Sequence, residues 1–211
     1  MESSELAPIS IPGRVVVFDY GEVISLTPSE EDRDRLLSVA EADADAFWPA
    51  YWRYREALDE GSLGIHDYWG AISDDLGVEW PPDRVHQLWV TDYTSWLSIN
   101  IDTTQIIDGL AAGGTRLALL SNAGRDFASF FRFGSLGPLF EHVFVSGELG
   151  LVKPDAAIYE HVLDQLGIVA TQMVFVDNRP ANVRGAEALG ITTHLFTSAG
   201  ELRRFLTELA D

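Results

Sequence analysis

Five short apolar runs limit the fold of this chain most strongly, because each is apolar almost throughout and gives way to polar or glycine-rich residues. They are RVVVFD at 14–19, TRLALLSN at 115–122, HVFVSG at 142–147, MVFVDN at 173–178 and THLF at 193–196. Continuous apolar runs, as opposed to alternating ones, indicate strands that are covered on both faces. Helix-like segments separate the last four runs. The pattern therefore predicts an α/β fold with a parallel sheet and crossover helices.

A segment of different character lies between the first and the second run. Residues 28–97 contain all six tryptophans, acidic helix-like stretches and a Pro-Pro pair at 81–82, and they show no convincing strand. We interpret this segment as a helical insertion that covers the end of the sheet as a lid. The predicted boundaries are a core at 1–25 and 98–211, with residues 1–12 as a loose tail, and a helical cap at 26–97.

Composition narrows the class of partner. The chain has 33 acidic residues against 14 Lys and Arg and a net charge of −19, so its field repels nucleic acid and anionic membranes. It has no cysteine, which excludes disulfides and fits a reducing compartment. The acidic start MESSELAPISIPG lacks the basic and apolar segments of a secretory signal. We therefore expect a cytoplasmic protein with a small-molecule substrate, and the sequence leaves the oligomeric state open.

Polar residues stand where a parallel sheet binds its ligands, beyond the carboxyl ends of the strands. They are Asp19, Ser121 with Asn122, and Asp177 with Asn178. The loop after the third run leads to Lys153, which is the only lysine among the 14 basic residues. A composition bias against lysine explains this as well as a need for a compact point charge in a tight site does.

These motifs, in this order, resemble the haloacid dehalogenase-like (HAD-like) hydrolase superfamily from residue 14 to about residue 196. The first family signature is an apolar strand followed by Asp-x-Asp-x-Thr/Val, and it appears here as VFDYGEV. The others are a strand that ends in Ser or Thr (LLSN), a lysine before a helix (LVKPDAAIY) and a strand that ends in paired acids (VFVDNRPANVRGAEALG). The resemblance implies a Rossmann-like three-layer core with a parallel sheet and a small all-helical cap domain.

The resemblance also implies a hydrolase that removes phosphate from a small phosphomonoester. Asp19 matches the nucleophile, whose attack on phosphorus forms an aspartyl-phosphate and splits one difficult displacement into two easier steps. Ser121 and Lys153 match the other catalytic residues, and together with Asn122 they match the groups that hold the phosphoryl oxygens. Arg125 and Arg179 lie near strand ends, where each binds a phosphate or carboxylate or forms a surface ion pair; both readings stay open.

The family commonly binds Mg²⁺, which prefers a few carboxylate or carbonyl oxygens plus water. The matching ligands are Asp19, the backbone carbonyl of Gly21, Asp177 and Asn178. Gly21 stands where the family has a second Asp that acts as acid and base, and Asn178 stands where a ligating acid is common. Fewer negative ligands predict weak Mg²⁺ binding. Glu22 is adjacent, but on an extended strand end we expect it to point the other way.

Three functional hypotheses follow. Members that resemble sugar-1-phosphate phosphatases also have Gly at the second Asp position and are still phosphatases, which favours a Mg²⁺-dependent phosphatase. Members that are 2-haloacid dehalogenases work without metal by attack of the same Asp on carbon, and they keep a Ser-Asn pair and a lysine. The two missing acids also fit a catalytically impaired or regulatory protein, because one fold carries many functions.

The aromatic stretch FWPAYWRYREAL at 47–58 is the candidate for substrate contacts from the cap. Its apolar residues recur at spacings of three and four, which favours a helix face buried inside the cap. Trp48 and Trp52 are the candidates for the alternative, in which this stretch faces the core and selects the substrate together with Tyr51 and Arg55.

Overall fold

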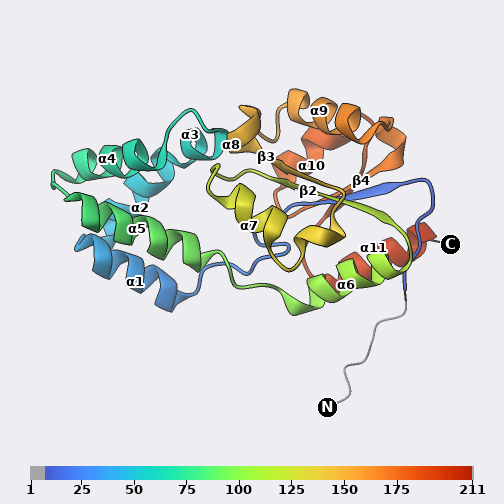
Figure 1. Cartoon of the computed structure of the whole chain (residues 1–211), viewed down its shortest axis with the longest axis horizontal. Helices are drawn as coiled ribbons and strands as arrows, with labels where there is room; N and C mark the ends of the chain where they lie inside the picture. The colour runs from blue at the N-terminus through green and yellow to red at the C-terminus, as the bar shows by residue number, and fades with distance from the viewer. Residues whose placement is uncertain (1–7, 211) are drawn as a thin grey trace, which may run out of the picture.

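The computed structural model describes residues 8–210, and a five-stranded parallel sheet forms its centre (Figure 1). The strand order is β3-β2-β1-β4-β5, so β1 lies in the middle. The strands are β1 (Val15–Phe18), β2 (Arg116–Ser121), β3 (His142–Val145), β4 (Met173–Asp177) and β5 (Thr192–Leu195). The parallel sheet predicted from the continuous apolar runs is confirmed, and all carboxyl ends lie along one edge.

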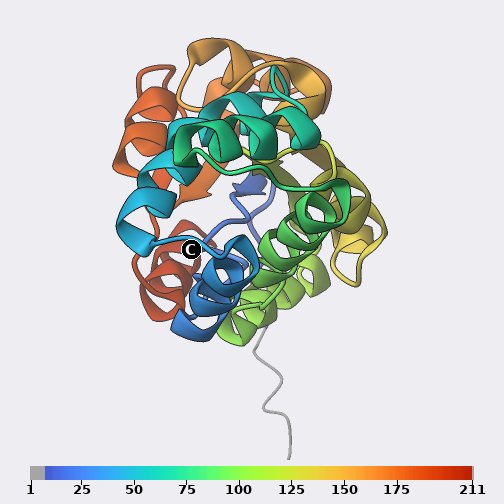
Figure 2. The ribbon, with the colours of Figure 1, turned by 90° about the vertical axis from the view of Figure 1, so that its left-hand side faces the viewer.

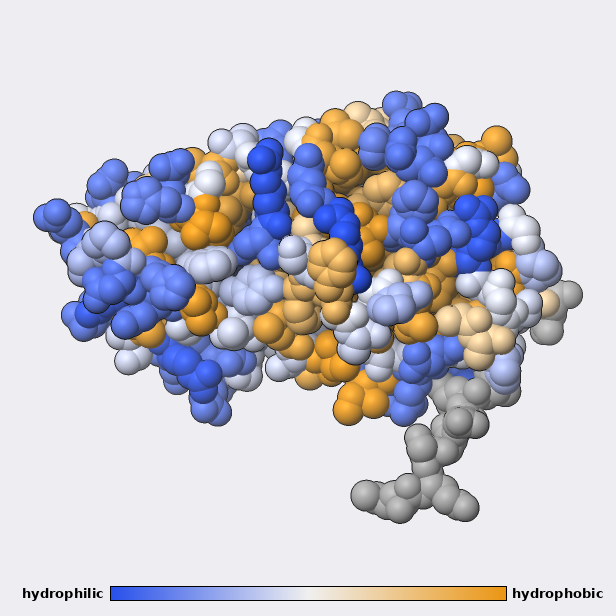
Figure 3. All heavy atoms as spheres, viewed as in Figure 1, coloured by the Kyte–Doolittle hydropathy of each residue, from blue (hydrophilic) through white to orange (hydrophobic). Residues whose placement is uncertain are grey.

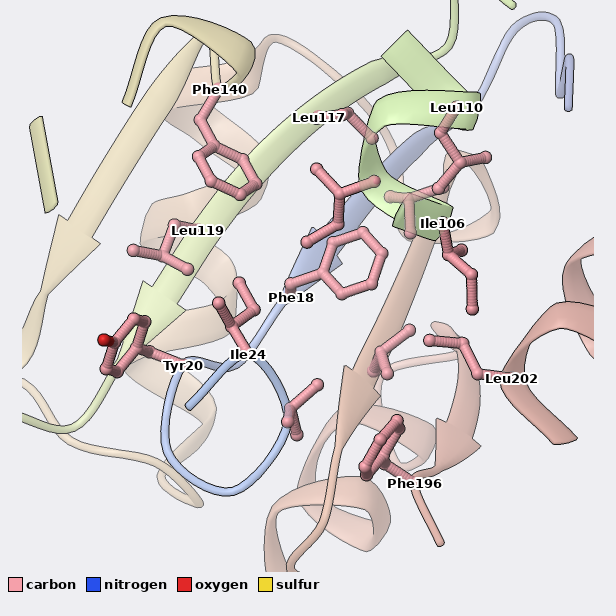
Figure 4. Close-up of a cluster of buried hydrophobic side chains, with 14 of the residues drawn as sticks. Phe18, Tyr20, Ile24, Ile106, Leu110, Leu117, Leu119, Phe140, Phe196 and Leu202 are labelled. Carbon is pink, nitrogen blue, oxygen red and sulfur yellow. The ribbon is translucent and has the colours of Figure 1, made fainter. Parts of the chain in front are cut away.

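Helices cover both faces of the sheet and complete the predicted three layers. One face packs against α6 (Ile101–Ala112), α7 (Phe127–Phe133) and α11 (Ala199–Ala210), and the other against α9 (Ala156–Leu166) and α10 (Pro180–Glu187). Alternate residues of β1 serve the two faces: Phe18 packs with Ile106 and Leu202 (Figure 4), whereas Val17 joins the opposite cluster. A strand needs apolar residues at every position to do this.

Short elements connect the larger ones along the sheet. They are the 3₁₀ turns η1 (Gly137–Leu139) and η2 (Ala170–Gln172) and the one-turn helix α8 (Ser146–Leu149). The helix α8 directly follows β3, in a segment that the sequence predicts as part of a strand end and a loop.

Five helices lie within residues 28–97, the segment predicted as a helical insertion, and they precede α6 in the chain. They are α1 (Glu30–Ala40), α2 (Ala44–Arg53), α3 (Arg55–Glu60), α4 (Ile65–Leu76) and α5 (Pro82–Ser95). Local signals set their ends: Ser29 caps α1 through the backbone N–H of Asp32, and Gly77 ends α4 in the left-handed conformation. The helices share their own buried cluster, which includes Tyr68 and Trp69. Figure 2 shows them standing in front of the end of β1.

Two chain segments join these five helices to the sheet, and they pair with each other. The N–H of Leu26 donates to the carbonyl of Ser98 at 2.7 Å, and the N–H of Asn100 donates to the carbonyl of Ile24 at 2.8 Å. A second connection lies further out, where the indole N–H of Trp89 donates to Asp126 at 2.7 Å. The five helices are therefore held against the edge of the sheet where the polar residues gather.

The predicted loose tail at residues 1–12 is wrong for the part that the structure describes. Ile9 and Ile11 are buried, and their N–H groups donate to the carbonyl of Gly109 and to the hydroxyl of Thr115, each at 3.0 Å. A side chain at Gly113 would place its Cβ 2.2 Å from the carbonyl oxygen of Ile9, so glycine permits this close approach. Residues 1–7 of the predicted tail lie outside the described residues.

Hydrophilic side chains dominate the outer end of the five helices, on the left of Figure 3, as the charge of −19 suggests. Among residues 8–210, no helix is long and apolar enough to cross a membrane.

Candidate active site

A cavity of about 250 Å³ opens between the carboxyl edge of the sheet and the five helices. Asp19, Glu22, Ser121, Asn122 and Lys153 line it from the side of the sheet. The strand order explains why residues so far apart in the chain meet here, because β1 lies between β2 and β4. The structure thus brings together all three residues predicted to be catalytic.

Lys153 is the centre of the site. Its Nζ lies 2.8 Å from Asp19 Oδ1, 2.8 Å from Asp177 Oδ2 and 3.0 Å from the carbonyl oxygen of Leu120. Burial disfavours the ammonium, but the two carboxylates outweigh it and hold the pKa of Lys153 above its usual range. Lys153 is therefore a fixed positive charge in a buried place.

Asp19 combines burial with a free oxygen. Burial raises the pKa of Asp19 to about 6, although the charge of Lys153 opposes the rise and the charge of Asp177 adds to it. Its Oδ1 accepts from the N–H of Tyr20 at 2.8 Å as well as from Lys153, whereas no hydrogen bond to Oδ2 is found among residues 8–210. The carboxylate is held at one oxygen and open at the other, as a nucleophile requires.

Asn122 holds the lysine loop in place. Its Nδ2 donates to the backbone carbonyl of Lys153 at 2.9 Å, and its Oδ1 accepts from the N–H of Lys153 at 3.0 Å. These paired bonds fix the loop that carries the lysine to the end of β2. Ser121, at the end of β2, is buried and borders the same cavity.

Asp177 lies behind the cavity. It is fully buried, and both of its oxygens accept hydrogen bonds: Oδ2 from Lys153 and from Asn182 at 2.9 Å, and Oδ1 from the N–H of Arg179 at 2.7 Å. It does not border the cavity. Of the four predicted metal ligands, Asp177 is thus the one whose oxygens are already in use, and the structure places it as the second partner of Lys153.

Asn178, which follows β4, forms a hydrogen-bonded pair with Glu22, which follows β1. The amide of Asn178 donates to Glu22 at 2.6 Å, and its Oδ1 is buried without a hydrogen-bond donor among residues 8–210. The expectation that Glu22 points away is wrong, because its φ of 59° places it in a turn after the strand and its side chain borders the cavity. Thr27 donates to the other carboxylate oxygen of Glu22 at 2.9 Å.

The donor set fits a magnesium ion with few acidic ligands. Two oxygens lack a partner in the described part of the chain, Asp19 Oδ2 and Asn178 Oδ1. Asp19 and Gly21 border the main cavity, whereas Asn178 does not and reaches it through its partner Glu22. Within residues 8–210 there is no cluster of three or more His, Cys, Asp or Glu that could hold a metal. Carboxylate and amide oxygens are ligands that Mg²⁺ accepts, and so small an acidic set favours weak binding.

Two predicted substrate contacts lie elsewhere. Arg125 is exposed and donates to the carbonyl of Gly147, outside the cavity. Trp48 borders a second, smaller cavity of about 60 Å³, which shares Trp52 and Trp96 with the main one. There the Arg33 guanidinium lies 5.7 Å from the ring of Trp48. Trp52 does border the main cavity, so one of the two tryptophans reaches the position predicted for it.

Sequence reasoning gave too little weight to a group on the opposite wall. Arg55 begins α3 and borders the main cavity; it donates to Asp59 at 3.0 Å and to Asp92 at 3.2 Å. Asp59 borders the cavity as well, and Asp92 is buried behind Arg55, where the hydroxyl of Tyr51 donates to it at 2.6 Å. The spacing of four between Arg55 and Asp59 was the one sequence signal for this pair.

A parallel sheet with a nucleophile-like aspartate and a buried lysine at its carboxyl edge defines a hydrolase with a carboxylate at its centre. The model of the haloacid dehalogenase-like hydrolase family matches residues 16–190. The chain therefore belongs to this family and is a HAD-like hydrolase, as the resemblance predicts.

Three similar proteins illustrate the relationship. Drimenol cyclase drtB of Aspergillus calidoustus is 32% identical over 118 residues, which are 53% of this chain and 22% of the cyclase. Sesquiterpene phosphatase astK of Aspergillus oryzae is 32% identical over 199 residues, 92% of this chain and 96% of the phosphatase. A HAD family enzyme from Bacteroides thetaiotaomicron, crystallised with magnesium and inorganic phosphate, shares the fold with a TM-score of 0.69 at 19% identity, over 89% of this chain and 95% of that one.

Proposed function

We propose that this hydrolase is a phosphatase that removes phosphate from a small phosphomonoester through an aspartyl-phosphate on Asp19. The observation that carries the proposal is the asymmetry of Asp19, whose Oδ1 is held by Lys153 and the N–H of Tyr20 while Oδ2 is open next to the cavity. The similarity to a sesquiterpene phosphatase over 92% of the chain supports phosphate esters as the substrate class.

Each residue of the site has its own role in the proposed reaction. Asp19 Oδ2 attacks phosphorus, and the bond from phosphorus to the ester oxygen breaks, which leaves the phosphoryl group on the carboxylate. The ester oxygen takes a proton from solvent and leaves as the alcohol, because Gly21 supplies no acid at the usual position. The phosphoryl oxygens lie near Ser121, Asn122 and the positive charge of Lys153. Because the Nζ of Lys153 already lies within hydrogen-bond distance of three oxygens, we assign it an electrostatic role that also fixes the orientation of the nucleophile. Water then attacks the acyl phosphate and releases a proton to solvent; inorganic phosphate leaves, and the carboxylate of Asp19 is restored.

A weakly bound Mg²⁺ belongs to this proposal. Asp19, the carbonyl of Gly21 and Asn178 would hold it, with Asp177 placed behind them as the partner of Lys153. When bound, Mg²⁺ neutralises charge on the transferring group and orients it. The five helices act as a cap domain, residues 26–97, which excludes water from the cavity during the transfer.

Phosphate release from a panel of phosphomonoesters, with and without Mg²⁺, tests the proposal. We expect release from the wild-type protein, stimulation by Mg²⁺, and loss of release in Asp19→Asn, which keeps the shape but not the nucleophile. Halide release from 2-haloacids in the absence of metal, without any phosphate release, would replace the proposal by a dehalogenase. Inactivity in both assays would favour a binding or regulatory role.

A further inference from the structure

The wall of the cavity opposite Asp19 combines an ion pair with two tryptophan rings. We define it by four residues of the cap and its connecting segment, namely Trp52, Arg55, Asp59 and Trp96, and call it the cap wall. It faces the place where the leaving group of a phosphomonoester would lie, because the phosphate end is fixed by Asp19.

Arg55 presents an unused hydrogen-bond donor in a rigid setting. Its Nε bonds to Asp59 and its Nη1 bonds to Asp92 and to the hydroxyl of Tyr51, while no partner of Nη2 is found among residues 8–210. The side chain is 12% exposed, and its guanidinium lies 5.8 Å from the ring of Trp96. Held on three sides, the guanidinium can offer Nη2 to a ligand at little cost in side-chain entropy.

The same wall offers an acceptor and little positive charge. Asp59 uses Oδ1 for Arg55, and no hydrogen bond to its Oδ2 is found within the described residues. Two carboxylates, Asp59 and Asp92, stand against the single charge of Arg55. Across the whole cavity, three acidic side chains face three basic ones: Asp19, Glu22 and Asp59 against Arg55, Lys153 and Arg179. The substrate's phosphate already adds negative charge there, so a second anionic group would be repelled.

Four aromatic side chains also line the cavity. Trp52 and Trp96 lie in the cap wall, and Tyr20 and Phe127 border the cavity from the core. Such rings bind apolar or flat groups and exclude water from them. The volume of about 250 Å³ lies just below the usual range of ligand pockets, about 300–1,000 Å³. The site therefore has room for a phosphate and a compact body.

We propose that the cap wall selects phosphate monoesters of compact, uncharged and largely apolar alcohols that carry a second oxygen for Arg55 and Asp59. This inference rests on the proposed phosphatase function and names its substrate class. Trp52 and Arg55 are then the residues that determine specificity: Trp52 contributes contact with the apolar body, and Arg55 contributes a directed hydrogen bond.

Four synthetic esters with similar primary-alcohol leaving groups test the proposal: benzyl phosphate, 4-(hydroxymethyl)benzyl phosphate, 4-carboxybenzyl phosphate and 2-hydroxyethyl phosphate. We expect kcat/KM to be highest for the hydroxymethyl compound. It should be roughly threefold to tenfold lower for benzyl phosphate, as the loss of one hydrogen bond implies, and at least about tenfold lower for the other two, as a lost apolar contact or an added charge implies.

Variants assign the preference to individual residues. Trp52 is 47% exposed, so Trp52→Ala is expected to fold; it should reduce the preference for benzyl over 2-hydroxyethyl phosphate about tenfold. Arg55→Lys keeps a charge beside the two carboxylates and should abolish the preference for the hydroxymethyl compound over benzyl phosphate. Trp48→Ala is the matched control, because Trp48 lies on the same helix as Trp52 but outside the main cavity, and both ratios should stay as in the wild type.

The outcomes separate this inference from the proposed function. Hydrolysis of all four esters at similar kcat/KM, or a preference for 4-carboxybenzyl phosphate, overturns the cap wall as a selector and leaves the phosphatase intact. The same result follows if Trp48→Ala changes the ratios as much as Trp52→Ala. If Asp19→Asn hydrolyses the esters as fast as the wild type, the proposed function itself fails.

Discussion

Replacing Asp19 with Asn should make the protein more stable at neutral pH while it abolishes turnover. Burial raises the pKa of Asp19 from 3.8 to about 6 in the folded chain. That rise of roughly two units, at about 1.36 kcal/mol per unit, means that the ionised carboxylate costs about 3 kcal/mol in the folded state. Asn is close in shape to the protonated acid and keeps an oxygen acceptor for Lys153. We expect the free energy of unfolding to rise by up to about 3 kcal/mol at pH 8.

The pH dependence gives this prediction its sign. Asp19 loses its proton near pH 3.8 in the unfolded chain and near pH 6 in the folded chain. The free energy of unfolding of the wild type therefore falls as the pH rises between these two values. Both proteins should be denatured with urea at pH 4, 6 and 8 without divalent cations. The free energy of unfolding of Asp19→Asn should exceed that of the wild type by nearly zero at pH 4 and by an amount that grows towards pH 8. Asp108→Asn, at an exposed position, is the control and should stay within about 0.5 kcal/mol of the wild type. A variant less stable than the wild type at pH 8, or an advantage independent of pH, would refute the reasoning.

Three further substitutions test other contacts. Lys153→Met leaves two buried carboxylates without their cation, and we expect urea denaturation to show a loss of about 3–5 kcal/mol. Gly61→Ala would put a Cβ 2.3 Å from a backbone carbonyl oxygen of α8, whereas Gly77→Ala, also at positive φ, meets nothing within 4 Å; thermal unfolding should show the larger loss at Gly61. Glu22→Gln removes the charge that holds the amide of Asn178, and Mn²⁺ titration calorimetry should show severalfold weaker binding.

The sheet could be predicted from the sequence because a strand that is buried on both faces requires a continuous run of apolar residues. Val15 to Phe18 are all fully buried, and only an unbroken apolar run satisfies that requirement. The order β3-β2-β1-β4-β5 leaves no such trace, because which strands pair depends on contacts between residues a hundred positions apart. The core residues of the site were predictable for the same reason as the sheet, since the carboxyl ends of parallel strands share one edge.

The predictions that failed at the site concern side chains whose positions depend on residues far away in the sequence. Glu22 was expected to continue an extended strand, but the chain turns directly after Asp19, and a positive φ at a glutamate gives no warning in the sequence. Arg125 and Arg179 looked equivalent near their strand ends. The carbonyl of Gly147 engages Arg125 outside the cavity, whereas Arg179 borders it. No local pattern distinguishes these two outcomes.

The single lysine of the chain now has a physical explanation that composition alone did not provide. An ammonium has three donors, and the Nζ of Lys153 lies within 3.0 Å of three oxygens, on Asp19, Asp177 and Leu120. The side chain of Lys153 is only 1% exposed, so a donor of its ammonium group without a partner would destabilise the folded protein. A guanidinium is planar and wider, and its five donors in a fixed fork cannot be satisfied by three oxygens gathered around one nitrogen. The other 13 basic residues of the chain can all be Arg, because none of them is required to fit this space.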